Sequence, residues 1–359
     1  MKIGLIGLPA SGKTTIFSLL TNISADAAAS GKTTANTGIA KIPDDRIDYL
    51  SSVYNPRKTT YATIEVTDIK GFASAGSSSA SANPFLESVR QVDALVLVAR
   101  LFRNDEVFHV EGSIDPIRDI ETINTEILFS DLSIVENRIS RIEKSNKITK
   151  DMQNEMEILK KCKGALEEGK HITSVGLTEE EMQYLKSFSF LTERPLVLLL
   201  NLDEQQFRSG EYPQKGEIQR YSKERGVPCL EICAGTELEI SRLEEEDKKL
   251  FMEDLGITET GTGRLASVMY DFLGLISFLT DGADEVRAWP VRKGISAKEA
   301  GGKIHSDIER GFIRAEVVAF EDFRKTGSMQ KAREKGLVRL EGKEYIIKDG
   351  DIVNFRFNI

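Results

Sequence analysis

The chain of 359 residues is longer than one hydrophobic core usually organises, so we expect two or three domains. Apolar residues make up 40% of the chain and charged residues 29%, which excludes a largely disordered or collagen-like protein. The net charge of −9 argues against a uniformly cationic nucleic-acid binder, and we expect no DNA partner. The longest apolar runs, residues 94–99 and 196–200, are far shorter than the roughly 18 residues of a membrane span. With no signal-peptide pattern at the start, we expect a cytoplasmic protein without a membrane partner.

The charge is spread unevenly along the chain. Residues 282–359 carry 16 Lys and Arg against 13 Asp and Glu, a balance of +3, whereas the remaining residues carry 32 against 44, a balance of −12. A mildly basic segment on an acidic protein is the charge pattern with which a domain can meet RNA phosphates.

The first half of the sequence indicates an α/β domain. Residues 2–6 are apolar and extended, and residues 14–20 have apolar side chains at helical spacing. Further strands are expected at residues 61–67, 94–98, 196–200 and 228–232. Buried apolar strands separated by helical stretches indicate a parallel sheet.

Two long helices are expected between the strands at 94–98 and 196–200. Apolar side chains recur at intervals of 4, 3, 4 and 3 from Leu128 to Ile142, and the pattern resumes from Met152 to Leu166 after a polar break over residues 145–150. Such seams predict an antiparallel helical hairpin that packs on itself. We expect this arm to occupy residues 110–186.

After residue 280 the sequence consists of short β-rich pieces. Residues 343–347 and 352–357 flank a turn at 348–351 and are expected to pair as a hairpin. The segment therefore predicts a small C-terminal α+β domain.

A phosphate-binding P-loop pattern follows the first predicted strand and opens the first predicted helix. Its glycines let backbone N–H groups and a helix N-terminus surround phosphate oxygens. We expect Lys13 to reach the β- and γ-phosphates and Thr14 to bind Mg²⁺; a chance Gly-rich turn is the alternative. The expected nucleotide-binding residues here are Gly7, Pro9, Ala10, Ser11, Gly12, Lys13, Thr14 and Thr15.

A second phosphate-side motif ends the strand near residue 67. Asp68 can hold Mg²⁺ through water, and the N–H of Gly71 can face the γ-phosphate. An ordinary aspartate at a strand end is the alternative interpretation.

The segment Asn201-Leu202-Asp203-Glu204 occupies the place where P-loop GTPases carry the base-reading Asn-Lys-x-Asp motif. Leu202 replaces the lysine, and the longer Glu204 replaces the aspartate that accepts hydrogen bonds from guanine. We therefore expect ATP to bind at least as well as GTP, with Asn201, Leu202 and Glu204 at the base. A surface turn after a strand is the alternative.

The chain resembles the YchF (Obg-like) ATPase family of P-loop proteins along essentially its whole length. Besides the P-loop and residues 201–204, the resemblance rests on the runs at 36–39, 115–124 and 301–316. It implies the fold class: an α/β P-loop NTPase domain with an inserted α-helical coiled-coil hairpin and a C-terminal β-grasp (TGS) domain. The implied boundaries are 1–109 with 187–280 for the nucleotide domain, 110–186 for the hairpin and 281–359 for the TGS domain.

The resemblance also implies an activity and a partner. It implies hydrolysis of ATP, often in preference to GTP, and association with ribosomes. We expect Mg²⁺ as cofactor and contacts with the ribosome or its RNA through the TGS domain and the helical arm. The family's base-flanking loop corresponds to Cys233, Ala234 and Gly235, for which a plain strand-to-helix turn is the alternative. A GTP-specific switch, or a docking module with a weakly active nucleotide site, are the alternative functions.

No motif in the sequence identifies the catalytic group that orients the attacking water. No glutamine follows Gly71, and His109 lies in a polar loop that resembles a histidine-containing loop of the family, so Lys13 and His109 are the expected catalytic residues. A structural or solvated histidine is the alternative. The family usually has an asparagine, associated with potassium, where this chain has Ala10, which leaves potassium stimulation open. Three threonines, Thr33, Thr34 and Thr37, compete for the second position on Mg²⁺.

Overall fold

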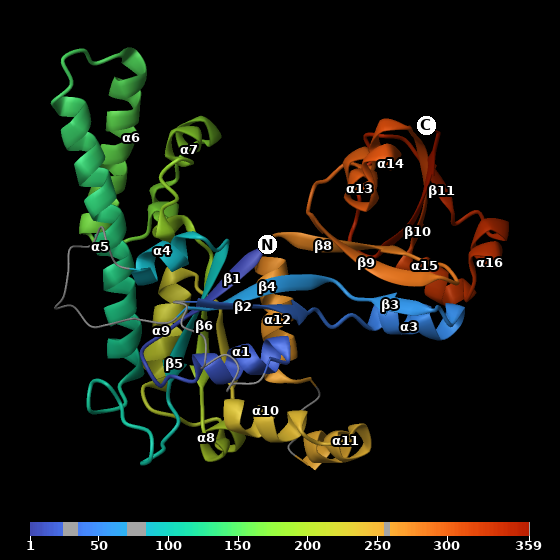
Figure 1. Cartoon of the computed structure of the whole chain (residues 1–359), viewed down its shortest axis with the longest axis horizontal. Helices are drawn as coiled ribbons and strands as arrows, with labels where there is room; N and C mark the ends of the chain where they lie inside the picture. The colour runs from blue at the N-terminus through green and yellow to red at the C-terminus, as the bar shows by residue number, and fades with distance from the viewer. Residues whose placement is uncertain (24–34, 70–83, 255–258, 359) are drawn as a thin grey trace. The chain divides into compact units, whose positions relative to one another are not determined.

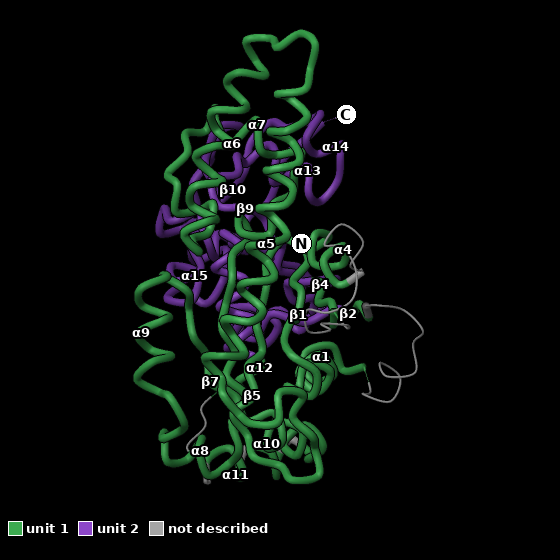
Figure 2. The backbone as a smooth tube through the Cα atoms, turned by 90° about the vertical axis from the view of Figure 1, so that its left-hand side faces the viewer, with its two compact units in different colours: residues 1–38, 65–262 green, residues 39–64, 263–359 purple. Residues whose placement is uncertain are grey.

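The computed structural model describes residues 1–23, 35–69, 84–254 and 259–358. The chain divides into two compact units, residues 1–38 with 65–262 and residues 39–64 with 263–359 (Figure 2). The second unit contains one whole sheet, and the first unit contains most of the other. Within the described ranges, no helix is long and apolar enough to cross a membrane.

The first unit is built on a six-stranded sheet with the order β2-β4-β1-β5-β6-β7 (Figure 1). β1 pairs in parallel with β4 and β5, and β6 pairs in parallel with β5 and β7. Every residue of β5 and β6 is buried, as expected for strands covered on both faces. The strands are β1 (Lys2–Ile6), β2 (Ala35–Lys41), β4 (Thr63–Ile69), β5 (Ala94–Arg100), β6 (Leu196–Asn201) and β7 (Cys229–Ile232).

The register of this sheet brings three strand ends to one edge. Arg100, the last residue of β5, lies beside Asn201, the last residue of β6, and Asn201 lies beside Ile232, the last residue of β7. The loops that follow these strands therefore start next to one another, at the edge where parallel α/β sheets bind ligands.

Several helices of the first unit pack around this sheet. A core of apolar side chains from β1, β5 and β6, with those from α4 and α9, fills the space between the layers. Apart from the arm, the helices are α1 (Lys13–Thr21), α4 (Pro84–Arg90), α8 (Glu204–Ser209), α9 (Lys215–Arg225), α10 (Ala234–Ser241) and α11 (Glu245–Asp254), and α12 (Gly261–Phe272) leads into the second unit.

The predicted helical hairpin is confirmed. It consists of α5 (Pro116–Glu143) and α6 (Lys150–Glu167), which run side by side (Figure 1). Their apolar seams form a core of their own, in which Val135 and Ile142 are fully buried with Leu159 and Cys162. Asp115 and Thr149 cap the two helices, accepting hydrogen bonds from Arg118 N and Met152 N.

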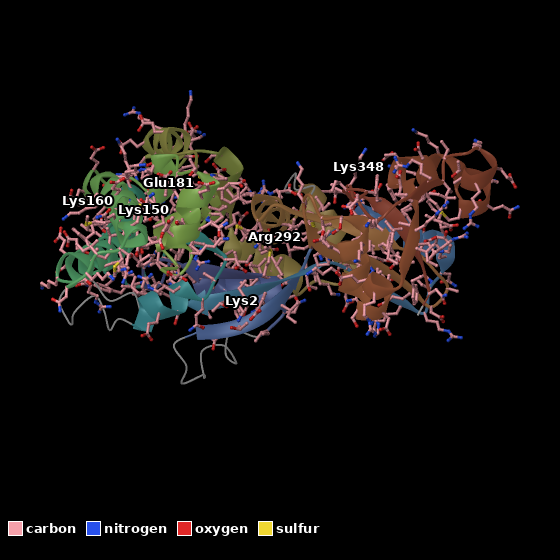
Figure 3. The ribbon with its side chains drawn as sticks, turned by 90° about the horizontal axis from the view of Figure 1, so that it is seen from above. Lys2, Lys150, Lys160, Glu181, Arg292 and Lys348 are labelled. Carbon is pink, nitrogen blue, oxygen red and sulfur yellow. The ribbon has the colours of Figure 1, made fainter. Side chains whose placement is uncertain are left out.

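Charged side chains cover the outside of the arm. Arg138 of α5 forms a two-point ion pair with Glu155 of α6, with both distances 2.8 Å. Figure 3 shows further charged side chains on α6 and α7 (Glu179–Leu185), among them Lys150, Lys160 and Glu181. Two short 3-10 turns, Ile172–Val175 and Leu191–Glu193, complete the return of the chain to β6.

The second unit contains a six-stranded sheet with the order β11-β10-β12-β8-β9-β3. β12 pairs antiparallel with β10 and parallel with β8, and β3 pairs parallel with β9. The strands are β3 (Lys58–Thr60), β8 (Leu275–Thr280), β9 (Glu285–Arg292), β10 (Phe312–Ala319), β11 (Arg339–Glu341) and β12 (Asp351–Phe357). The helices are α3 (Asp45–Tyr54), α13 (Ala297–Ile304), α14 (Ser306–Arg310), α15 (Phe320–Thr326) and α16 (Met329–Glu334). A core that includes Phe278, Val317 and Phe355 lies between the sheet and α13.

The expected hairpin of residues 343–347 with 352–357 is wrong. β12 lies between β10 and β8, so both of its edges are already paired. Residues 343–347 form no strand, and Ile346 makes only a single bridge to Ser296. Asp351 closes the turn by accepting hydrogen bonds from Lys348 N and the Tyr345 hydroxyl, both at 2.9 Å.

Candidate functional site

The P-loop connects β1 to α1 through an unusual backbone. Gly12, the residue before α1, has φ 97°, and Ala10 has φ 61°, a left-handed conformation that is uncommon for alanine. Among the described residues, no side chain caps the first turn of α1. The free N–H groups and the positive end of the helix dipole therefore suit a phosphate.

Two of the P-loop glycines are required by close contacts. A Cβ atom on Gly7 would lie 2.5 Å from the carbonyl oxygen of Val98 in β5. A Cβ on Gly12 would overlap the side-chain amide of Asn201. Of the other predicted residues, Ser11 is buried, whereas Pro9 and Ala10 are exposed.

Lys13 is buried and folds back over the P-loop. Its ammonium donates hydrogen bonds to the carbonyl oxygens of Gly7 and Leu8, at 2.9 and 2.8 Å. Burial lowers the pKa of Lys13 from 10.5 to about 8, and the nearby carboxylate of Asp68 partly opposes this shift. The side chain is therefore placed beside the P-loop as a cation that an incoming phosphate would stabilise.

Thr14 and Asp68 meet at the carboxyl end of β4. The hydroxyl of Thr14 donates to Oδ2 of Asp68 at 2.9 Å. Asp68 is fully buried, and its Oδ1 and the buried hydroxyl of Ser11 have no hydrogen-bond partner among the described residues. Oxygen donors of this kind suit Mg²⁺, so the residues present fit the expected metal. No group of three or more His, Cys, Asp and Glu side chains that could hold a metal ion occurs in the described ranges.

Asn201 joins the P-loop to the far side of the site. Its Nδ2 donates to the carbonyl oxygen of Ser11 at 3.0 Å, and its Oδ1 accepts from Ala234 N at 3.2 Å. The side chain is almost completely buried. The amide predicted to read the base thus holds two backbone segments in place.

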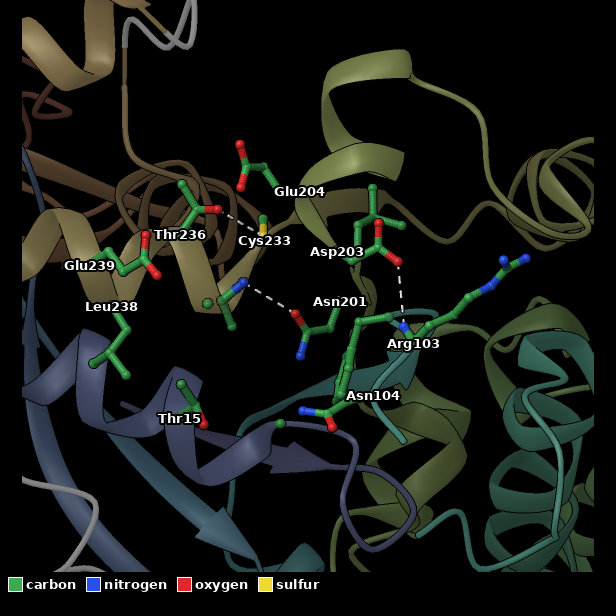
Figure 4. Close-up of a pocket in the computed structure, with 15 residues that line it drawn as sticks. Thr15, Arg103, Asn104, Asn201, Asp203, Glu204, Cys233, Thr236, Leu238 and Glu239 are labelled. Carbon is green, nitrogen blue, oxygen red and sulfur yellow. Dashed lines mark hydrogen bonds between the residues drawn. The ribbon is translucent and has the colours of Figure 1, made fainter. Parts of the chain in front are cut away.

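A cavity of about 400 Å³ opens between these segments (Figure 4). The P-loop contributes Gly12 and Thr15, and the base-reading segment contributes Asn201, Leu202 and Glu204, as the sequence predicts. Cys233, Ala234 and Gly235 complete this predicted set, with Cys233 directly before the first residue of α10. Lys13, Thr14 and Asp68 do not line this cavity, which lies on the side of the residues predicted to meet the base.

The two unusual base-site residues differ in exposure. Leu202 is almost fully buried, whereas Glu204 is exposed and forms an ion pair of 2.9 Å with Arg208 one turn further along α8. In this arrangement the Glu204 carboxylate is engaged along its own helix.

Sequence reasoning missed part of the cavity wall. The missed residues are Phe102, Arg103 and Asn104 after β5, Asp203 beside the base motif, and Thr236, Leu238 and Glu239 on α10. Backbone N–H groups of Leu101 and Phe102 donate to the carbonyl oxygen of Asn201 at 2.9 and 3.0 Å, which fastens the loop after β5 to the base motif. The sequence feature that could have identified residues 102–104 is the position of their loop, which follows a buried parallel strand next to β6.

His109 is buried and bonded through both ring nitrogens. Its Nε2 lies 3.0 Å from Oδ2 of Asp119, and its Nδ1 accepts from Glu111 N at 3.2 Å. Since Nδ1 accepts, Nε2 carries the proton and donates to the carboxylate. In this conformation the ring fixes the loop before α5.

The remaining predicted residues concern the phosphate side. Gly71, Thr33 and Thr34 lie outside the described residues. Thr37 is described, and its hydroxyl lies 3.3 Å from that of Thr67 on β4.

These features define the class of protein to which the first unit belongs. A P-loop between a strand and a helix, with an aspartate at the end of the neighbouring strand and an asparagine after β6, belongs to a P-loop nucleotide-binding domain of the GTPase type. In agreement, the family model described as "50S ribosome-binding GTPase" matches residues 2–138. A second family model, YchF-GTPase_C, described as a protein of unknown function, matches residues 275–358.

Full-length relatives identify the family. The chain is 43% identical to the "Ribosome-binding ATPase YchF" of Bacillus subtilis over 99% of both chains. It is 38% identical to the protein of that name from Escherichia coli O157:H7, over 100% of this chain and 99% of the relative. The chain belongs to the YchF family.

Solved structures agree with this fold. The YchF GTPase of Schizosaccharomyces pombe, 29% identical, superposes with a TM-score of 0.87 over 99% of this chain and 97% of that chain. A GTP-binding protein from Pyrococcus horikoshii, 20% identical, shares the fold with a TM-score of 0.58 over 100% of both chains.

Proposed function

We propose that this protein binds and hydrolyses ATP with Mg²⁺ and uses its nucleotide state to regulate association with the ribosome. The observation that carries the proposal is the group formed by Lys13, Thr14 and Asp68, in which a buried ammonium, a hydroxyl and an unpaired carboxylate oxygen converge beside a P-loop. Relatives that bear the name ribosome-binding ATPase supply the partner.

Each residue has a role set by its chemistry. The P-loop N–H groups and Lys13 hold the phosphates and neutralise their charge, while Thr14 and Asp68 hold the metal. Mg²⁺, when bound, stabilises negative charge on the phosphate oxygens. Asn201, Leu202 and Glu204, with the loop from Cys233 to Gly235, surround the base.

His109 is the candidate for orienting the attacking water. To do so, its ring must leave Asp119, because both nitrogens are bonded in this conformation. A His109→Ala variant separates the two roles. A water-orienting role predicts lost turnover with unchanged ATP affinity, whereas an anchoring role predicts a lower unfolding temperature.

We assign contact with the ribosome to two segments of the chain. These are the TGS domain at residues 281–359 and the helical arm at 110–186, attached to the nucleotide domain at 1–109 and 187–280. Within the first, residues 282–359 have a charge balance of +3, and the turn of the arm carries exposed lysines at 144, 147 and 150. Charge-reversing Lys298→Glu or Lys147→Glu should weaken ribosome binding and reduce its dependence on salt.

The function is tested by nucleotide binding followed by phosphate release. We expect ATP to bind at least as well as GTP in the presence of Mg²⁺, and ribosomes to change the rate of phosphate release. Lys13→Ala should lower ATP affinity or turnover about tenfold to a hundredfold, since a bond to a charged group is lost. Lys2→Ala, which removes a half-exposed lysine paired with Glu65, is the matched control. Normal binding and turnover in Lys13→Ala would refute the P-loop assignment, and a tenfold preference for GTP would favour the GTPase alternative.

A further inference from the structure

The loop that follows β5 is organised around one buried side chain, Arg100. This arginine is only 3% exposed, although arginine is rarely buried in proteins. It is the last residue of β5 and therefore lies at the edge of the sheet where the cavity opens. The established motifs of the site do not include it.

The guanidinium group of Arg100 binds backbone carbonyl groups of the loop. It donates hydrogen bonds to four carbonyl oxygens: those of Phe102 and Phe108 at 3.4 Å, Asn104 at 3.2 Å and Val107 at 2.9 Å. The same group stacks on the ring of Phe102, with its central carbon 4.5 Å from the ring centroid. A planar cation with five donors is suited to collecting several carbonyl groups into one turn.

The loop held in this way is a wall of the base cavity. Phe102, Arg103 and Asn104 line the cavity, opposite residues of α10 (Figure 4). The wall is also held by hydrogen bonds from Phe102 N to the Asn201 carbonyl at 3.0 Å, from Arg103 N to the Asp203 carboxylate at 3.4 Å and from Val107 N to the Asn104 carbonyl at 3.2 Å. Arg100 adds bonds to two carbonyls of the wall, those of Phe102 and Asn104, and its other two bonds hold Val107 and Phe108. It therefore ties the wall to the rest of the loop from inside.

The far end of the loop is fixed separately. His109, directly after the last carbonyl bound by Arg100, is bonded to Asp119 in the first turn of α5. The segment from 102 to 108 is thus held between the sheet and the arm, and loss of Arg100 would release its middle without detaching its ends.

We infer that Arg100 is a positioning residue for nucleotide binding: it holds the wall formed by residues 102–104 in the shape that receives the base. The inference rests on the proposed function, because it takes the cavity to be the nucleotide site. Arg100 touches neither the P-loop lysine nor the Thr14–Asp68 pair in any described contact. Its loss should therefore weaken nucleotide binding while leaving the phosphate chemistry of a bound nucleotide intact.

The test compares Arg100→Lys with Arg194→Lys in the full-length chain. Lysine keeps the charge but lacks the planar fork, so most of the carbonyl bonds are lost. Arg194 is a matched control, being half-buried in the same unit and donating to the carbonyl of Arg90 at 3.0 Å, away from the cavity. The dissociation constant of ATP, KM and kcat are measured together with hydrogen exchange of residues 102–108.

For Arg100→Lys we expect the dissociation constant and KM to rise about tenfold or more, with kcat within about threefold of wild type. Exchange at the amides of residues 102–107 should become faster, because their bonds to Asn201, Asp203 and Asn104 loosen. Arg194→Lys should bind ATP like wild type.

Unchanged ATP affinity in Arg100→Lys, when the wild type binds ATP, would overturn the inference. If Arg100→Lys does not fold, Arg100→Gln is used with the same expectations; failure of both to fold, while Arg194→Lys folds, would assign Arg100 to global stability and also overturn it. Failure of the wild type and Arg194→Lys to bind any nucleotide would instead refute the proposed function.

Discussion

Replacing Asn201 by alanine should uncouple the P-loop from the base loop. The substitution removes the amide that donates to Ser11 O and accepts from Ala234 N. Ser11 and Ala234 are both buried, so a carbonyl and an N–H group lose their partner inside the protein.

The expected loss of stability comes from the carbonyl group of Ser11 and the N–H group of Ala234. A buried polar group left without a partner costs about 1–3 kcal/mol, and part of this is recovered where water reaches the cavity. We expect the free energy of unfolding to fall by about 2–4 kcal/mol. The affinity for ATP should fall about tenfold to a hundredfold, because both segments that meet the nucleotide lose their fixed spacing.

Denaturant unfolding and an ATP titration with Mg²⁺ measure these two quantities. Asn124→Ala is the matched control: Asn124 is equally buried, and its Oδ1 accepts a 2.6 Å bond from His171 on the arm side of the unit. The control should lose stability without losing ATP affinity. If Asn201→Ala loses stability and keeps its ATP affinity within about threefold, the bracing role of Asn201 is refuted.

Three further predictions concern single groups in the site. ATP affinity should fall as the pH rises through about 8, because burial lowers the pKa of Lys13 to about 8 and the ammonium is lost. Between this value and 10.5 the unfolded chain retains a proton that the folded chain has released, so the contribution of Lys13 to the free energy of unfolding rises with pH. Glu204→Asp should raise GTP affinity relative to ATP several-fold, since the shorter carboxylate restores the usual acceptor for guanine. Ala10→Gly should raise the free energy of unfolding by about 0.5–1 kcal/mol, because glycine adopts the left-handed φ of 61° without the cost that alanine bears.

Each of these predictions has a control and a contrary result. The pH dependence of ATP affinity and of stability should both weaken in Lys13→Met, and an unchanged profile would assign the titration to another group. Glu204→Gln should leave ATP affinity unchanged, and an equal ATP to GTP ratio before and after Glu204→Asp would show that this position does not read the base. A loss of stability in Ala10→Gly would show that the left-handed backbone there carries no strain.

Local sequence was enough to find the parts of the nucleotide site that lie within one motif. The P-loop, the buried strands and the helical seams from Leu128 to Leu166 are determined by short-range patterns of glycine and apolar spacing, and the structure contains each of them. Asp68 and Asn201 are predicted by short motifs that each follow a buried strand. The prediction of the C-terminal hairpin is wrong because it also rested on a local pattern. A turn pattern cannot reveal that β12 is already paired on both sides.

Only the tertiary structure decided which partners these residues have. The bond between Asn201 and Ser11 joins residues 190 positions apart, and the pairing of Thr14 with Asp68 spans 54. The burial that lowers the pKa of Lys13 and the bonds that hold His109 to Asp119 likewise depend on segments packed around them. Arg100 is an unremarkable arginine in the sequence, and its four carbonyl partners exist only because the loop folds back over the end of β5. Sequence specifies the chemical groups and their local conformation, whereas hydrogen-bond partners and solvent exposure are properties of the packed chain.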